Sequence, residues 1–194
     1  MGGIHGDEPA TVDLLVALCG RLAGRGDLAD WADWADLPPL WLLPAANPDG
    51  LARNRKNSER DVDLNRNFPA RSFTTTHTPG YFPGPAPLSE PETQAIAALL
   101  AREPIRGAVA VHAPFGCVNY DGPAAGWAQA VAAACGWPAQ ADIGYPTPGS
   151  FGSWLGVDRG LPILTLELPA GPLDLFSGQA TAALQASFDY FRRR

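Results

Sequence analysis

Three short apolar runs constrain the fold of this chain more than any other feature. They lie at residues 40–43, 107–111 and 161–166 and contain almost no polar side chain. A strand buried on one face alternates apolar and polar residues, whereas runs this continuous suit strands covered on both faces. The chain between and around them carries helix signals at residues 9–24, 89–102, 123–135, 150–154 and 177–191. We therefore predict an α/β fold, a mixed and mostly parallel sheet with helices on both faces.

Local signals predict several boundaries within this pattern. Ser89 reads as the N-cap of a helix, with Glu92 completing a capping box, and Ser150 reads as the cap of a short helix. Residues 26–38 read as a polar loop, and residues 69–88, rich in Pro, Gly and Thr, as a long surface loop that could cover a site.

Length and composition narrow the classes of function. The 194 residues predict one domain, residues 1–194, and 14 basic against 20 acidic side chains give a net charge of -6. This charge argues against nucleic-acid and membrane partners, and no apolar run is long enough for a transmembrane helix. The start carries no signal-peptide pattern and the three cysteines have no CxxC spacing, so we expect a cytoplasmic protein without a disulfide.

Polar residues follow two of the apolar runs directly. His112 ends the second run and Glu167 the third, and residues 5–8 (HGDE) place His5 and Glu8 just before a predicted helix. Carboxyl ends of strands in an α/β sheet gather ligands, so these side chains are expected at one site. Two imidazoles and a carboxylate match a catalytic zinc site. Each residue also has an ordinary interpretation: a hydrogen-bonded core histidine, an ion-paired glutamate, or polar residues at a helix N-terminus.

The remaining histidine and a group of cations are less specific. His77 falls in the long loop and is interpreted as a solvated residue rather than a ligand. Residues 53–57 (RNRKN) and 63–68 (DLNRNF) bring several cations close to the predicted site. They form either a solvated face or, in a cleft, clamps for a carboxylate.

The order of these motifs along the chain resembles the zinc carboxypeptidase family. Two further stretches, residues 89–95 and 144–154, resemble the sequences of one branch of that family. Members of this branch cleave the γ-D-glutamyl–diaminopimelate amide of murein tripeptide. The family normally has strands before its first zinc motif, so the resemblance implies a catalytic domain that lacks them. The matching motifs are HGDE at 5–8, NPDG at 47–50, DLNRNFP at 63–69, His112, and LE at 166–167.

The resemblance implies a role for each metal-site residue. His5, Glu8 and His112 would bind one Zn²⁺ per chain, and Glu167 would be the general base. Asp63 would hydrogen-bond His5 and fix its ring.

It also implies a set of substrate residues. Arg55 would polarise the scissile carbonyl, although Arg53 lies close enough in the chain to be the alternative. Asn65 and Arg66 would hold the substrate carboxylate, and Tyr145 would close over a small, murein-tripeptide-like peptide.

Two other functions stay open. Succinylglutamate desuccinylases and aspartoacylases also pair HxxE with a distant His and an Asp-Leu-Asn-Arg stretch, although residues 47–50 and 147–154 argue against them. A chain without the family's first strands could alternatively be an inactive pseudoenzyme.

Overall fold

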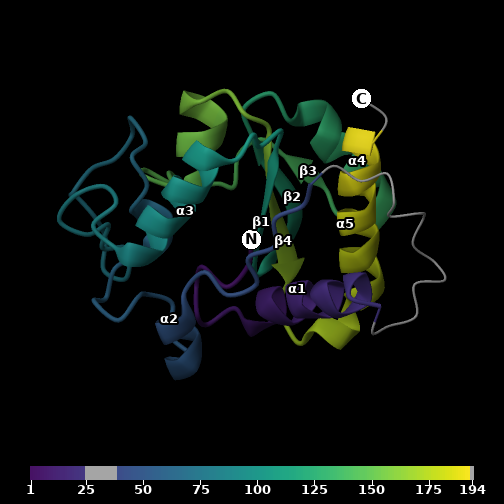
Figure 1. The fold of residues 1–194 in the computed structure, drawn as a ribbon, viewed down its shortest axis with the longest axis horizontal. Helices are drawn as coiled ribbons and strands as arrows, with labels where there is room; N and C mark the ends of the chain where they lie inside the picture. The colour runs from purple at the N-terminus through teal and green to yellow at the C-terminus, as the bar shows by residue number, and fades with distance from the viewer. Residues whose placement is uncertain (25–38, 193–194) are drawn as a thin grey trace.

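A four-stranded sheet forms the centre of the structure (Figure 1). The computed structural model describes residues 1–24 and 39–192, so the loop predicted at 26–38 lies outside the described residues. The strand order is β1-β4-β2-β3; β4 pairs in parallel with β1 and antiparallel with β2, which pairs in parallel with β3. The predicted α/β class with a mixed, mostly parallel sheet is confirmed. The strands are β1 (Ala108–His112), β2 (Phe115–Asp121), β3 (Ala139–Gln140) and β4 (Ile163–Pro169).

Helices cover both faces of this sheet, as the continuous apolar runs predicted. On one face, α1 (Pro9–Leu22), α4 (Ala125–Cys135) and α5 (Ser177–Arg192) share a core with β1, β2 and β4. On the other face, α3 (Pro91–Arg102) contributes Ile96 to a second core. The remaining elements are short: α2 (Pro48–Arg53), η2 (Leu64–Arg66), η3 (Ser153–Asp158) and η4 (Leu173–Leu175).

Alternation along β4 separates the two cores. Leu164, Leu166 and Leu168 belong to the core under α1, α4 and α5, whereas Ile163 belongs to the core of α3. Because side chains alternate between faces, Glu167 lies on the same face as Ile163. The second face therefore holds an apolar core at one end of β4 and an acidic side chain near its carboxyl end.

The strand predicted at residues 40–43 is wrong. This segment is extended but pairs with no strand among the described residues, and Trp41 within it is half exposed. A backbone hydrogen bond from Gly2 N–H to the Leu43 carbonyl (2.9 Å) ties its end to the start of the chain. Apolar composition alone could not show that no neighbouring strand lies alongside it.

Two capping predictions had different outcomes. Helix α3 has Glu90, not Ser89, as its N-cap, because the Ser89 hydroxyl is bonded to Asn67 and to the Glu90 carboxylate. The predicted capping box at Ser89 is therefore wrong. Ser150 does cap a helical turn, since its Oγ accepts from Ser153 N–H at 3.0 Å. That turn continues through η3 to Asp158, beyond the predicted end at residue 154.

The other sequence predictions can be stated briefly. Residues 69–88 form neither helix nor strand and run along one side of the molecule (Figure 1). Cys19, Cys117 and Cys135 are all free thiols. Within the described residues no helix is long and apolar enough to cross a membrane.

Candidate metal centre and active site

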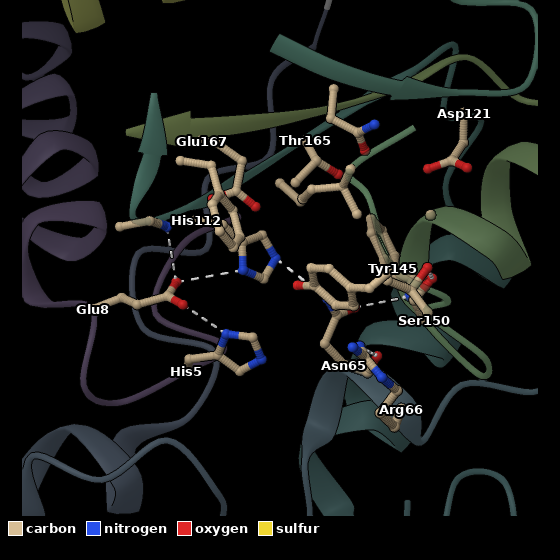
Figure 2. A pocket seen from close by; sticks show the side chains of 18 of the residues that line it. His5, Glu8, Asn65, Arg66, His112, Asp121, Tyr145, Ser150, Thr165 and Glu167 are labelled. Carbon is tan, nitrogen blue, oxygen red and sulfur yellow. Dashed lines mark hydrogen bonds and ion pairs between the residues drawn. The ribbon is translucent and has the colours of Figure 1, made fainter. Parts of the chain in front are cut away.

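Three side chains from distant parts of the chain converge on one point (Figure 2). His5 precedes α1, Glu8 is the N-cap residue of α1, and His112 is the last residue of β1. The Glu8 carboxylate lies between the two rings: Oε1 is 2.8 Å from His5 Nδ1, and Oε2 is 3.4 Å from His112 Nδ1. One ligand atom from each residue lies within 4.8 Å of the other two. Among the described residues, His5, Glu8 and His112 are the group of His and acidic side chains close enough together to hold one metal ion. His77 is not part of this group.

A tight turn presents His5 and Glu8 together. Glu8 N–H donates to the His5 carbonyl (3.3 Å), and Thr11 Oγ1 donates to the Glu8 carbonyl (2.8 Å). Gly6 lies against the backbone of Gly50 and Arg55, so closely that a β-carbon there would overlap them. The HGDE sequence can therefore pack on this neighbouring loop only because its second residue is glycine.

A second layer of polar contacts holds His5 from behind. Its Nε2 lies 3.3 Å from Asp63 Oδ1, and Lys56 Nζ lies 2.8 Å from Asp63 Oδ2. A carboxylate at Nε2 leaves Nδ1 as the ring atom directed toward Glu8. Two imidazole nitrogens and one carboxylate, with a carboxylate behind one ring, form the donor set and outer contacts of catalytic zinc sites. The residues therefore fit the metal that the sequence predicts.

The charges of this group stabilise one another. Burial favours the neutral form of the Glu8 carboxyl, but the His112 and His5 rings outweigh it and lower its pKa to about 2. Burial likewise opposes the charge on His5, yet its bonds to Asp63 and Glu8 raise its pKa to about 9. Asp63 is fully buried, and its pKa is held well below the usual range because His5 and nearby cations outweigh burial. Glu8 and Asp63 are thus charged at neutral pH.

Glu167 lies beside the triad through the register of the sheet. It pairs with His112 across β1 and β4 and with Cys117 across β4 and β2. Burial raises the pKa of its carboxyl, partly opposed by His112, and Oε2 has no hydrogen-bond partner in the part of the chain described. A buried carboxylate with one free oxygen and a raised pKa can take up and return a proton.

The pocket wall opposite the strands carries Asn65 and Arg66 from η2. Asn65 Oδ1 accepts from Phe151 N–H (3.0 Å), and its Nδ2 lies 3.5 Å from His112 Nε2. Arg66 is almost fully buried, with Nη1 bonded to the Asn65 carbonyl (2.7 Å), and it also interacts with the Tyr145 hydroxyl. Tyr145 lines the pocket but is 39% exposed, and its ring is 6.2 Å from that of Phe115. The structure brings these three predicted residues to the triad.

Arg55 is placed differently from the others. Its side chain is 54% exposed, its Nη2 lies 3.2 Å from Asp61 Oδ1, and it does not line the pocket. Arg53, the alternative, is also on the surface and pairs with Glu59. Neither guanidinium is at the triad in this structure, so the role of Arg55 stays a prediction.

Sequence reasoning assigned no individual role to several residues near the site. Lys56 supports Asp63, and its Nζ lies 3.4 Å from the centre of the Tyr81 ring. Tyr81 itself comes from the long loop at 69–88 and lines the pocket, which agrees with a loop covering the site. Asp121 and Asn119, on β2, also line the pocket. Cys117, Asn119 and Asp121 are spaced two residues apart, which is the spacing of side chains on one face of a strand. No strand was predicted there from the sequence, so this pattern was not used.

Comparison with known proteins finds a matching family model, related sequences and a similar solved structure. The family model described as zinc carboxypeptidase matches residues 1–125. Murein peptide amidase A of Escherichia coli strain K12 is 32% identical over 181 residues, covering 87% of this chain and 69% of that protein. The enzyme of the same name from Vibrio campbellii is 30% identical over 188 residues, covering 90% and 70%. The crystal structure of murein-tripeptide amidase from Escherichia coli O157 superposes with a TM-score of 0.71 at 28% identity, covering all of this chain and 79% of that one.

Proposed function

The chain belongs to the zinc carboxypeptidase family and is a hydrolase, and we propose that it hydrolyses a peptide amide next to a free carboxylate with one zinc ion. His5, Glu8 and His112 are the proposed ligands. The observation that carries this proposal is the Glu8 carboxylate held between Nδ1 of both rings, with Asp63 behind His5. Such an arrangement of buried groups has no evident purpose in a hydrophobic core, where charged side chains are costly.

The proposed role of each group in the reaction follows from the position of its side chain. A bound zinc ion supplies a Lewis acid and lowers the pKa of a coordinated water. Glu167, adjacent to His112, takes the proton of the attacking water and returns it to the leaving amine. Its raised pKa suits both steps, because the carboxylate binds a proton more readily than an exposed glutamate does.

The substrate carboxylate is assigned to Arg66 and Asn65. Arg66 is a nearly buried cation on the pocket wall, and a guanidinium binds a carboxylate through two parallel hydrogen bonds. Holding the terminal carboxylate there fixes the scissile amide relative to Glu167. Tyr145, half exposed beside Arg66, is placed to close over the bound peptide.

We infer that the bond cleaved is the γ-D-glutamyl–diaminopimelate amide of murein peptides. Support comes from the relatives named murein peptide amidase A, which match most of the chain. The stretch that carries Tyr145 and Ser150, which resembles that branch of the family in sequence, lines the pocket.

The test is incubation of zinc-supplemented protein with L-alanyl-γ-D-glutamyl-diaminopimelate and, separately, with N-succinylglutamate. We expect release of free diaminopimelate and L-alanyl-D-glutamate, with no release of succinate. Succinate release alone would assign the chain to the deacylases instead. Turnover of neither compound by protein that binds zinc would contradict the proposed substrate and favour the pseudoenzyme.

A further inference from the structure

One aromatic side chain of the pocket contacts two cations. Tyr81, from the loop at residues 69–88, lines the pocket and is 37% exposed. Lys56 Nζ lies 3.4 Å from the centre of its ring, and the guanidinium carbon of Arg66 lies 5.3 Å from it. The face of an aromatic ring attracts a cation within about 6 Å of the ring centre. The ring of Tyr81 therefore stabilises two positive charges that would otherwise repel each other.

Arg66 is a buried cation that no carboxylate neutralises. It is 5% exposed, and its Nη1 donates to the Asn65 carbonyl at 2.7 Å. In the described part of the chain, no acidic side chain lies within ion-pair distance of its guanidinium. Asp63, whose pKa is lowered partly by Arg66, forms its ion pairs with other residues. A buried charge without a counterion is costly, so the neutral contacts of Arg66, the Tyr81 ring among them, have to stabilise it.

A neutral partner suits a guanidinium that has to bind a carboxylate. An aspartate or glutamate at position 81 would pair with Arg66, and an incoming carboxylate would have to displace it. The face of an aromatic ring attracts the positive charge but accepts none of the N–H groups that form the two parallel bonds to a carboxylate. The contact with Tyr81 therefore holds Arg66 and leaves its hydrogen-bond donors free for a ligand.

The backbone on both sides of Tyr81 is tied to the interior. Lys56 Nζ donates to the Gly80 carbonyl at 3.4 Å and pairs with Asp63 Oδ2 at 2.8 Å. Asp63 N–H donates to the Phe82 carbonyl at 2.8 Å, and the Asp63 side chain is fully buried. The position of the ring is therefore set by the residues before and after it as well as by its own contact with Arg66.

We propose that Tyr81 is a positioning residue for Arg66: its ring holds the buried guanidinium in place for the substrate carboxylate without neutralising the charge. The proposal rests on the proposed function, because that function assigns the substrate carboxylate to Arg66. Tyr81 acts through the face of its ring, so its hydroxyl is dispensable. Loss of the ring weakens the binding of ligands that carry the carboxylate and leaves the binding of uncharged analogues unchanged.

Kinetics on L-alanyl-γ-D-glutamyl-diaminopimelate test whether Tyr81 affects binding rather than chemistry. We expect Y81L to raise KM about 3- to 30-fold, because a buried cation loses its contact with an aromatic face. The value of kcat should change less than about threefold, because an interaction made equally in the ground state and the transition state affects KM alone. Y81F keeps the ring and should match wild type. F82L removes the neighbouring aromatic ring, which does not line the pocket, and should leave KM unchanged.

Binding without turnover keeps this inference separate from the proposed function. Zinc-supplemented E167Q is titrated by calorimetry with the same tripeptide and with the tripeptide whose terminal α-carboxylate is converted to an amide. We expect the free acid to bind at least about 10-fold more tightly than the amide, because only the acid forms charged hydrogen bonds with Arg66. Adding Y81L should weaken the acid about 3- to 30-fold and leave the amide unchanged, whereas adding Y81F should change neither.

Several results would overturn the positioning role. Equal weakening of acid and amide by Y81L would show that the ring only packs the loop, and equal losses in Y81F and Y81L would assign the effect to the hydroxyl. Equal affinity of E167Q for acid and amide, or no effect of Y81L on either, would also contradict the proposal. If wild-type protein cleaves no peptide but the acid preference is present and Y81L reduces it, the proposed hydrolysis fails while the role of Tyr81 is supported.

Discussion

His112 on β1 and Glu167 on β4 are direct partners in the parallel register of the sheet. Parallel neighbours at one position present their side chains on the same face, so the proposed metal ligand and the proposed proton acceptor lie side by side without help from a loop. Glu8 reaches the same point from the start of α1, and its Oε2 also accepts from Ala113 N–H at 3.2 Å. The sheet thus fixes the distance between His112 and Glu167, the two residues that the proposed reaction needs closest together.

Replacing Glu167 with Gln removes the proposed proton acceptor while keeping the shape of the side chain. We expect E167Q to lower kcat on the murein tripeptide by at least about 100-fold, because general base catalysis contributes about 10²- to 10⁴-fold. Zinc content, measured by mass spectrometry of the metal, should stay at the wild-type level. E103Q, the same change outside this pocket, is the control, and retained turnover in E167Q would contradict the role of Glu167.

Asp63 is expected to act through His5 rather than on the substrate. D63N keeps an oxygen for Asn65 N–H, which Asp63 Oδ1 accepts at 2.9 Å, but it removes the charge behind the ring. Zinc affinity should fall about 10- to 100-fold, measured by competition with a chromogenic chelator. D49N, at an exposed position of α2, should bind zinc normally. Unchanged affinity in D63N would show that Asp63 only supports the fold.

Arg55 and Arg53 form a natural pair for comparison, since both are in surface ion pairs with acidic residues. Such pairs contribute about 0–1 kcal/mol, so Arg55 can leave Asp61 at little cost when a substrate binds. We expect R55A to lower kcat about 100-fold, the effect of losing one group that stabilises the developing oxyanion, with little change in KM. R53A should change kcat less than threefold. The opposite result would assign the role to Arg53.

Replacing Gly6 and Gly20 with alanine tests two different effects on stability. At Gly6 the added β-carbon meets the packed backbone of the site, and at Gly20 it only changes the helix propensity of α1. A β-carbon on Gly6 would overlap the Gly50 and Arg55 backbone, whereas nothing lies within 4 Å of one on Gly20 in α1. G6A should lower the free energy of unfolding by about 1–3 kcal/mol through overpacking. G20A should raise it by about 0.5–1 kcal/mol because alanine favours the helix. Urea unfolding of both variants checks this, and equal stability of G6A and wild type would contradict the packing at the turn.

The sequence located the residues of the candidate metal site more accurately than the elements around them, for a physical reason. His112 and Glu167 follow apolar strands whose composition indicates burial on both faces, so their position at a shared edge could be inferred. The segment at 40–43 is equally apolar, but whether a strand forms depends on a neighbour that composition does not show. Phe115–Asp121 was missed because its mixed residues pair antiparallel with β4, a contact set by the tertiary fold.

The sequence does not show in which direction a side chain points, and this limited the prediction of the substrate-binding residues. Asn65 and Arg66 reach the pocket because the short η2 turn is anchored by Asp63, a local signal present in the motif. Arg55 lies on the connection before it, where nearby acidic residues compete for its guanidinium, and no spacing rule shows which partner it takes. Asp121 could be recognised only once β2 was placed beside β4.

Zinc stoichiometry tests the central claim most directly. Protein stripped with a chelator, incubated with zinc and freed of excess metal should contain one zinc per chain. H112A should contain less than about one tenth of that amount, since one of three ligands is lost, while H77A, which alters the exposed loop histidine, should match wild type. Wild-type protein that retains no stoichiometric zinc, or H112A that retains as much as wild type, would contradict a metal centre at His5, Glu8 and His112.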